Sequence, residues 1–110
     1  MKSDLLFYVV SARKWPSLTI EGHFVPEELK EKGKISLVEP QQVNTYLNEH
    51  FSGRKNLFLL IIDITRMEKR PKKQDGHFIL EHSIPVDAIL DKIRLDSSKE
   101  GFFDIQIEQN

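Results

Sequence analysis

The chain has 110 residues, of which 39% are hydrophobic and 30% are charged, and its formal net charge is −1. This composition argues against intrinsic disorder, a membrane protein and a nucleic-acid binder with a uniformly basic surface. Cysteine is absent, which excludes disulfides and thiolate chemistry. The length predicts a single domain, residues 1–110, with one hydrophobic core.

The first apolar run, Leu5–Val10, predicts a buried strand because it is rich in aromatic and β-branched residues. It is short and no cleavage signal follows it, so we interpret it as a strand, not a signal peptide, and expect a cytoplasmic protein. A short helical segment carrying Trp15 follows, with Ser11 as its N-cap and Gly22 at its end.

The next part of the chain predicts two helices and a strand. Residues His23–Gly33 include one or two helical turns, because glutamates occupy the first turn and lysines the last. Lys34–Val38 reads as a short strand. The main helix covers residues 40–51, where apolar and aromatic side chains recur with helical spacing. They are Val43, Tyr46, Leu47, His50 and Phe51.

The segment from Leu57 to Ile64 is the most continuously apolar part of the chain. A run of this length and composition predicts a strand covered on both faces, which belongs at the centre of a sheet. The expected fold class is therefore α+β. We expect a single compact domain with a bent, mixed or mainly antiparallel sheet, one main helix and short helical turns.

The segment from Arg66 to Gly76 has a strong basic bias and turn signals, so we interpret it as an exposed, mobile loop that does not contribute to the core. Residues 66–73 of this basic loop are candidates for binding phosphate groups or an acidic protein partner. The alternative is a solvated loop that only keeps the chain soluble. Its basic residues are Arg66, Lys69, Arg70, Lys72 and Lys73, opposed by Glu68 and Asp75.

Two strands and one ambiguous segment follow the basic loop. Residues His77–Ile84 predict a strand that Pro85 ends. The segment Pro85–Leu95 fits both a helical stripe and a strand face, and we prefer a brief turn at residues 86–88 followed by a strand. Alternating apolar residues predict a final strand over Phe103–Ile107.

The four histidines do not form a metal motif, and we expect no metal site. His50 falls on the packing stripe of the main helix. His82 follows Glu81, but neighbouring residues on a strand point to opposite faces, which disfavours a direct acid–base pair. There is no nucleophile elbow and no glycine-rich phosphate loop. Residue patterns alone therefore identify no catalytic group.

Several landmarks nevertheless follow one another in a distinctive order: LLFYVVS, Trp15, GKISLVEPQQV, FSGRKNLFLLIID and PVDAILDKIRL. This order, from about Leu5 to Phe103, resembles a bacterial family of small domains, domain-of-unknown-function family 952. The fold of that family is grouped with the ADP-ribosyltransferases. The resemblance therefore implies an ADP-ribosyltransferase-like scaffold.

Individual positions depart from the family pattern. The family's G-F-I-H-x-S falls on residues 33–38, so its His corresponds to Ser36 and its Ser to Val38. A His or Lys in the first strand of the family corresponds to Tyr8. The F-P-H-x-Y motif falls within residues 78–83 without its Pro and first His, and the family's W-E pair, expected near residues 67–70, is not recognisable. The chain thus resembles a diverged member that lacks most of the polar pocket residues.

The resemblance implies a cleft between the first strand and the G-x-I-x-x-V segment. Polar side chains expected to face it are Tyr8, Ser36 and His82, with Arg13 or Arg70 as a phosphate contact. We expect a catalytically inactive module that binds a nucleotide or another phosphorylated small ligand. The alternatives are a transferase that processes ADP-ribose or NAD, and a protein-interaction domain that uses the basic loop.

No cofactor is expected, and NAD or ADP-ribose is implied by the resemblance alone. We expect no nucleic-acid partner and no membrane association. Neither the residues nor the resemblance identifies a ligand or an oligomeric state.

Overall fold

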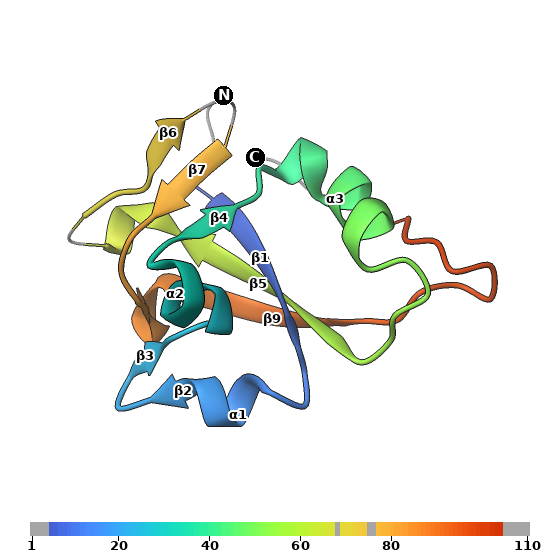
Figure 1. Cartoon of the computed structure of the whole chain (residues 1–110), viewed down its shortest axis with the longest axis horizontal. Coiled ribbons are helices and arrows are strands. Elements are labelled where there is room, and N and C mark those ends of the chain that lie inside the picture. Colours follow the sequence, from blue (N-terminus) through green and yellow to red (C-terminus); the bar gives the residue numbers. More distant parts are fainter. Residues whose placement is uncertain (1–4, 68, 75–76, 105–110) are drawn as a thin grey trace.

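The computed structural model of the chain describes residues 5–67, 69–74 and 77–104. Within these ranges, short strands and helices alternate along the chain, and the strands pair into antiparallel sheets (Figure 1). This is the α+β class expected from the sequence. None of the helices in the described part has the length and hydrophobicity that crossing a membrane needs.

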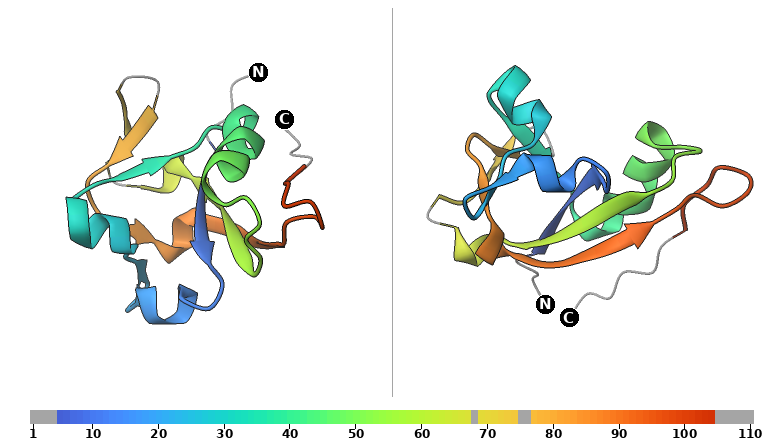
Figure 2. Two further views of the ribbon diagram at one scale, coloured as in Figure 1. Left: turned by 45° about the vertical axis from the view of Figure 1, so that its right-hand side comes forward. Right: turned by 90° about the horizontal axis from the view of Figure 1, so that it is seen from below.

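The central sheet consists of β1 (Leu5–Ser11), β5 (Leu57–Asp63) and β9 (Ile89–Leu95), with β5 in the middle. Both ladders are antiparallel, and β1 pairs with β5 over its whole length. The predicted central position of the apolar run is therefore confirmed. Strand β9 forms the outer edge, away from the helices, and most of its residues are exposed (Figure 2).

A second sheet, in the order β4-β7-β6, continues from the first. It consists of β4 (Ile35–Leu37), β7 (His77–Leu80) and β6 (Lys72–Gln74). One isolated bridge joins the two sheets: the amide of Phe7 donates to the Val38 carbonyl at 2.8 Å, and the amide of Val38 donates to the Phe7 carbonyl at 2.8 Å. The strands of the two sheets therefore form one bent hydrogen-bonded layer.

A third small sheet consists of β2 (Thr19–Ile20), β3 (His23–Phe24) and β8 (Ile84–Pro85). The sequence did not predict β2 and β3, because two residues are too short to show a pattern. Gly22, expected to end a helix, instead sits in the turn of the β2–β3 hairpin. There Glu21 has φ 50° and Gly22 has φ 81°, a left-handed conformation in which glycine is unstrained.

The helices are short, as expected. The first, α1 (Trp15–Leu18), has Lys14 and not Ser11 at its N-cap, so the predicted cap is wrong. Helix α2 (Glu27–Lys32) ends at Gly33, which has φ 76°. The main helix consists of a 3-10 turn, η1 (Pro40–Gln42), followed by α3 (Val43–His50). Two further 3-10 turns are η2 (Ile64–Arg66) and η3 (Val86–Ala88).

The core lies on both faces of β1 and β5 because successive side chains of a strand point to opposite faces. On one face, Leu6, Tyr8 and Val10 join residues of β3, β4, β7 and β8. On the other face, Phe7 and Val9 join residues of α3 and Phe103. A continuous apolar run suits this environment because most side chains on both faces of β1 and β5 are buried.

The basic loop predicted for residues 66–76 is wrong in two respects. Residues Lys72–Gln74 form β6, which pairs with β7. Met67 is buried at 6% exposure and belongs to the core on the Tyr8 face. The segment is therefore attached to the core and to the sheet, because its one large apolar side chain is buried and Lys72 and Lys73 lie on an edge strand.

Two other strand predictions need correction. The strand expected over residues 77–84 is interrupted, since 81–83 link β7 to β8. Of the final strand expected over residues 103–107, residues 105–107 lie outside the described part. Phe103 is buried outside any strand, and its amide donates to Asn48 Oδ1 at 2.7 Å. The turn at residues 86–88 and the strand after it are as preferred from the sequence.

Replacing a leucine of β5 should destabilise the chain far more than replacing a leucine of β9. Leu59 is fully buried, whereas Leu90 is 45% exposed. We expect Leu59→Ala to lower the free energy of unfolding by about 2–5 kcal/mol, since a core cavity remains. The matched variant Leu90→Ala should change it by less than about 1 kcal/mol. Urea unfolding of both variants gives the two values, and equal losses would contradict a central β5.

A second pair of variants tests the attachment of the basic segment. Met67→Ala should lower the free energy of unfolding by about 2 kcal/mol or more, because a buried side chain is removed from the core. Lys69→Ala, two residues away and exposed, should change it by about 0.5 kcal/mol or less. If thermal or urea unfolding shows Met67→Ala to be as mild as Lys69→Ala, the segment is not anchored.

Candidate functional site

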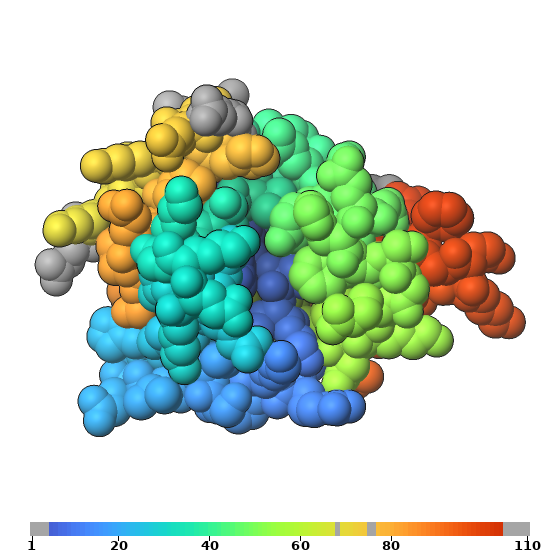
Figure 3. Space-filling model, in the orientation of Figure 1, coloured from blue at the N-terminus to red at the C-terminus, as the bar shows by residue number. Residues whose placement is uncertain are grey.

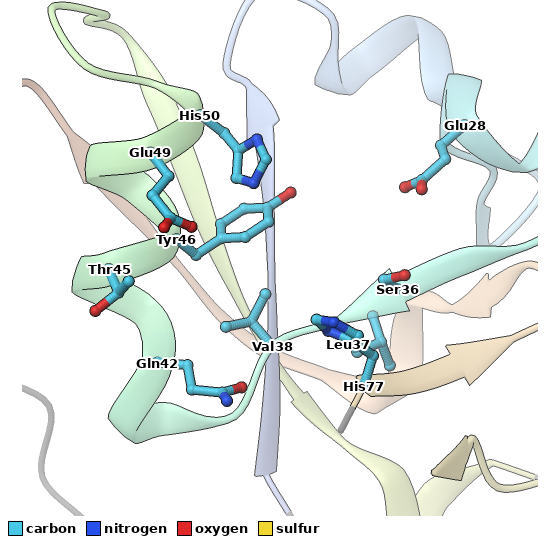
Figure 4. A pocket seen from close by; sticks show the side chains of 10 residues that line it. All are labelled: Glu28, Ser36, Leu37, Val38, Gln42, Thr45, Tyr46, Glu49, His50 and His77. Carbon is cyan, nitrogen blue, oxygen red and sulfur yellow. The ribbon is translucent and has the colours of Figure 1, made fainter. Parts of the chain in front are cut away.

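The bridge between Phe7 and Val38 is the closed end of a fork between β1 and β4. The described residues form no second bridge between these strands, and β4, which ends just before Val38, runs away from β1 (Figure 4). Helix α2 lies on one side of the fork and α3 on the other. A space-filling view shows the hollow between the two helices, with β1 at its base (Figure 3). We call this hollow the α2–α3 groove.

The larger cavity of the α2–α3 groove has a volume of about 520 Å³. This volume falls in the range of ligand sites in proteins, about 300–1,000 Å³. Its wall combines the apolar Leu37 and Val38 with polar side chains from α2, β4, η1, α3 and β7. Among these polar side chains are Glu28, Ser36, Tyr46, Glu49 and His50.

A smaller cavity of about 210 Å³ lies at the β1 side of the groove. Glu28 lines both cavities, so the groove extends from α3 past this carboxylate towards α1. Two basic residues line the smaller cavity, Lys14 and Arg54. Lys14 Nζ pairs with Glu27 Oε1 at 2.9 Å, and the Arg54 guanidinium lies over the Phe51 ring, 5.6 Å from its centre.

Local helix geometry places the aromatic wall of the groove. Tyr46 and His50 are four residues apart on α3, so they share one helix face. Their ring centres are 4.7 Å apart, with 44° between the ring planes. Across the groove, Glu28 is in the first turn of α2 and its carboxylate points into the cavity, towards the hydroxyl end of Tyr46 (Figure 4).

Glu28 is the electrostatic centre of the site. The Tyr8 hydroxyl donates a hydrogen bond to Glu28 Oε1 at 3.2 Å. Burial, and then the Glu28 carboxylate, raise the pKa of Tyr8 above its ordinary value of 10.0. The same two causes, in the same order, raise the pKa of Tyr46. Both phenols therefore ionise only at a higher pH than a free tyrosine, and the protonated Tyr8 hydroxyl is the donor to Glu28.

The groove thus offers a defined set of contacts to a ligand. Carboxylates accept hydrogen bonds from hydroxyl or amino groups, and the tilted rings of Tyr46 and His50 offer aromatic faces against which a ring can pack. Arg54 adds a positive charge at the β1 side. No group of three or more His, Asp or Glu side chains able to hold a metal occurs in the described part of the chain.

The structure brings together only part of the site expected from the sequence. Ser36 lines the larger cavity, and Tyr8 lines the smaller one. His82 and Arg70 lie in a different cavity of about 640 Å³, beside the basic segment, so the expected convergence of Tyr8, Ser36 and His82 is not found. Arg13 is exposed and lines none of these three cavities.

The position of His82 has a physical cause. It lies in the link between β7 and β8, where its Nδ1 is 2.8 Å from the Ser83 carbonyl and its Nε2 is 3.2 Å from the Lys69 carbonyl. These contacts hold the ring against the basic segment and away from the groove.

Sequence reasoning missed Glu28, Tyr46 and His50 as site residues. The helical pattern assigns Tyr46 and His50 to packing, yet Tyr46 is half-buried and His50 is exposed at the groove. The sequence did contain one indication of this site: Tyr46 and His50 carry polar atoms on a helix stripe that is otherwise apolar. Glu28 gave no signal beyond its place in the first turn of a helix, because its partner Tyr8 is 20 residues away.

The family model described as "Protein of unknown function (DUF952)" matches residues 9–103. The chain belongs to this family. Residues of the groove on β1, α2, β4 and α3 therefore lie almost wholly inside the family match. The search of curated proteins gives no match.

Solved structures of protein CC0527 from Caulobacter crescentus, a structural genomics target, are similar to the chain. The crystal structure is 22% identical, with a TM-score of 0.75, and the match covers 89% of this chain and 91% of that one. The solution structure is 22% identical, with a TM-score of 0.72 and 90% coverage of both chains. This DUF952 chain therefore shares the fold of CC0527.

The two tyrosines of the chain should resist ionisation together. Because both pKa values are raised, the native protein should show little tyrosinate absorbance at pH 10, where an unfolded chain is half-ionised. The unfolded state then binds fewer protons than the folded state, so the free energy of unfolding should fall as pH rises above about 10. Ultraviolet titration of native and unfolded protein measures both effects.

Glu28→Gln isolates the carboxylate in the same titration. It should lower both tyrosine pKa values, because Glu28 raises each of them. Glu31→Gln on the same helix is the matched control and should leave both unchanged, since Glu31 is exposed and lines neither groove cavity. If the two tyrosines of the native protein titrate like free tyrosine, the raised pKa values of Tyr8 and Tyr46 are contradicted.

Proposed function

We propose that the chain is a ligand-binding module, and that the α2–α3 groove binds a nucleotide. The observation that carries the proposal is Glu28, a half-buried carboxylate that lines both cavities and accepts a hydrogen bond from Tyr8. Buried or half-buried carboxylates in a concave site bind hydroxyl or amino groups of ligands.

The arrangement of the groove supports a particular placement of that ligand. A base packs against the Tyr46–His50 pair, since a flat ring gains from contact with aromatic side chains. Ribose hydroxyls donate to Glu28, and Ser36 supplies a further polar contact on β4. The phosphate extends to the β1 side of the groove and meets Arg54, where Glu27 also lines the cavity but is paired with Lys14.

Two positions support binding without catalysis. Ser36 and Val38 stand where the resemblance places a His and a Ser of the family. Both line the larger cavity, so a hydroxyl replaces an imidazole, and an apolar side chain replaces a hydroxyl. This site therefore lacks polar groups that the family pattern places in its pocket. The ADP-ribosyltransferase-like grouping of the fold and the cytoplasmic location stay predictions.

Calorimetric titration with adenosine, AMP, ADP-ribose and NAD tests the proposal. We expect AMP or ADP-ribose to bind and to raise the melting temperature, because a ligand of the folded state stabilises it. Glu28→Ala and Tyr46→Ala should each weaken binding about tenfold or more, as expected when a charge-assisted hydrogen bond or a stacking surface is lost. Arg54→Ala should weaken AMP binding and leave adenosine binding unchanged.

Matched controls separate the groove from general charge effects. Glu31→Ala, on the exposed side of α2, should bind like the unmodified chain. Failure of all four ligands to bind at millimolar concentration would contradict the proposal. Release of nicotinamide from NAD, lost in Glu28→Ala, would favour the ADP-ribose transferase alternative over an inactive module.

A further inference from the structure

A third cavity lies beside the basic segment, away from the α2–α3 groove, and has a volume of about 640 Å³. We call it the basic cavity. Four of the residues that line it are cationic and one is a carboxylate, in a chain whose formal net charge is −1. Positive charge is therefore concentrated here. The charged and imidazole residues are Lys69, Arg70, Lys72, Lys73, Glu81 and His82.

The cations of the basic cavity stand on a fixed support. Met67 anchors the segment in the core, and residues 72–74 are held in the ladder with β7. Between these points, His82 Nε2 lies 3.2 Å from the Lys69 carbonyl. A solvated loop that serves only solubility needs no such attachments, because its charges act without a fixed position.

The electrostatics of the two sites are opposite. The larger cavity of the groove carries the carboxylates of Glu28 and Glu49, whereas the basic cavity carries an excess of lysine and arginine. Hydrogen bonds from Thr65 lower the pKa of Asp63, and the charges of Arg66 and Arg70 add smaller lowering effects. An anion approaching the molecule is therefore attracted to the basic cavity and repelled from the Glu49 side of the groove.

We propose that the basic cavity binds a small ligand that carries two or more phosphate groups. The lining carries four cations and the Glu81 carboxylate, a net charge of +3, and one phosphate monoester, with a charge of about −2, leaves part of this charge unneutralised. Arg70 offers the paired donors that suit phosphate oxygens, and Lys69 and Lys72 add mobile charges around it. His82 acts as a positioning residue, because both of its ring nitrogens face main-chain carbonyls.

Calorimetric titration with inorganic tripolyphosphate tests this site without using the groove. We expect binding that weakens steeply as salt is added, since the contacts are charge–charge contacts. Lys69→Glu/Lys72→Glu should weaken binding about tenfold or more. Lys55→Glu/Lys99→Glu makes the same charge change at exposed residues that line neither site. The affinity of this control variant for tripolyphosphate should stay within about threefold of that of the unmodified chain. Circular dichroism of both double variants verifies folding.

The source of the phosphates is distinguished in the same series. Vesicles of phosphatidylcholine with a phosphoinositide bisphosphate, sedimented against vesicles of phosphatidylcholine alone, report a lipid headgroup. Binding of tripolyphosphate without vesicle binding reports a free ligand, and either result supports the site. Equal losses in the two double variants, no binding of either probe, or binding of an oligonucleotide alone would overturn the proposal. Glu28→Ala should bind tripolyphosphate normally, so the two proposed sites fail or succeed independently.

Discussion

The hydrogen-bond pair between Phe7 and Val38 is the contact on which the rest of the architecture depends. It is the only bridge between β1 and β4 in the described part of the chain, and it joins the central sheet to the sheet that contains β6 and β7. Because it closes one end only, the strands part beyond it. The chain connections then place α2 and α3 on opposite sides of the opening, so the groove follows from a bridge that is not extended into a ladder (Figure 1).

Features that depend on local pattern were predictable from the sequence. The central position of β5 follows from an apolar run that leaves no polar face, and α3 from a stripe with helical spacing. Strand β6 was not predictable, because Lys-Lys-Gln has no strand character and pairs only because β7 is beside it. The hydrogen bond between Tyr8 and Glu28 was equally unpredictable, since it depends on tertiary folding and not on a local spacing of residues. Site residues were therefore harder to predict than core residues.

The net charge of this DUF952 chain does not reveal how its charged residues are distributed over the structure. A value of −1 describes a nearly neutral molecule, yet the structure separates a groove with carboxylates from a cavity with four cations. This separation arises because the acidic residues lie on α2 and α3, and the basic residues lie in and before the edge strand β6. Both tyrosines of the chain are on the acidic side, where burial and Glu28 keep them un-ionised.

The bridge also bears on how such a site changes during evolution. Val38 contributes its main-chain amide and carbonyl to the bridge, so its side chain is not needed for the hydrogen bonds that shape the fork. Ser36, two residues earlier, likewise pairs through its main chain with Ile79. A substitution at Ser36 therefore changes the lining of the cavity and leaves these main-chain hydrogen bonds in place, whereas Val38 is buried in the core and tolerates less change. A change of ligand at this cavity therefore needs a new side chain at position 36 and no new backbone.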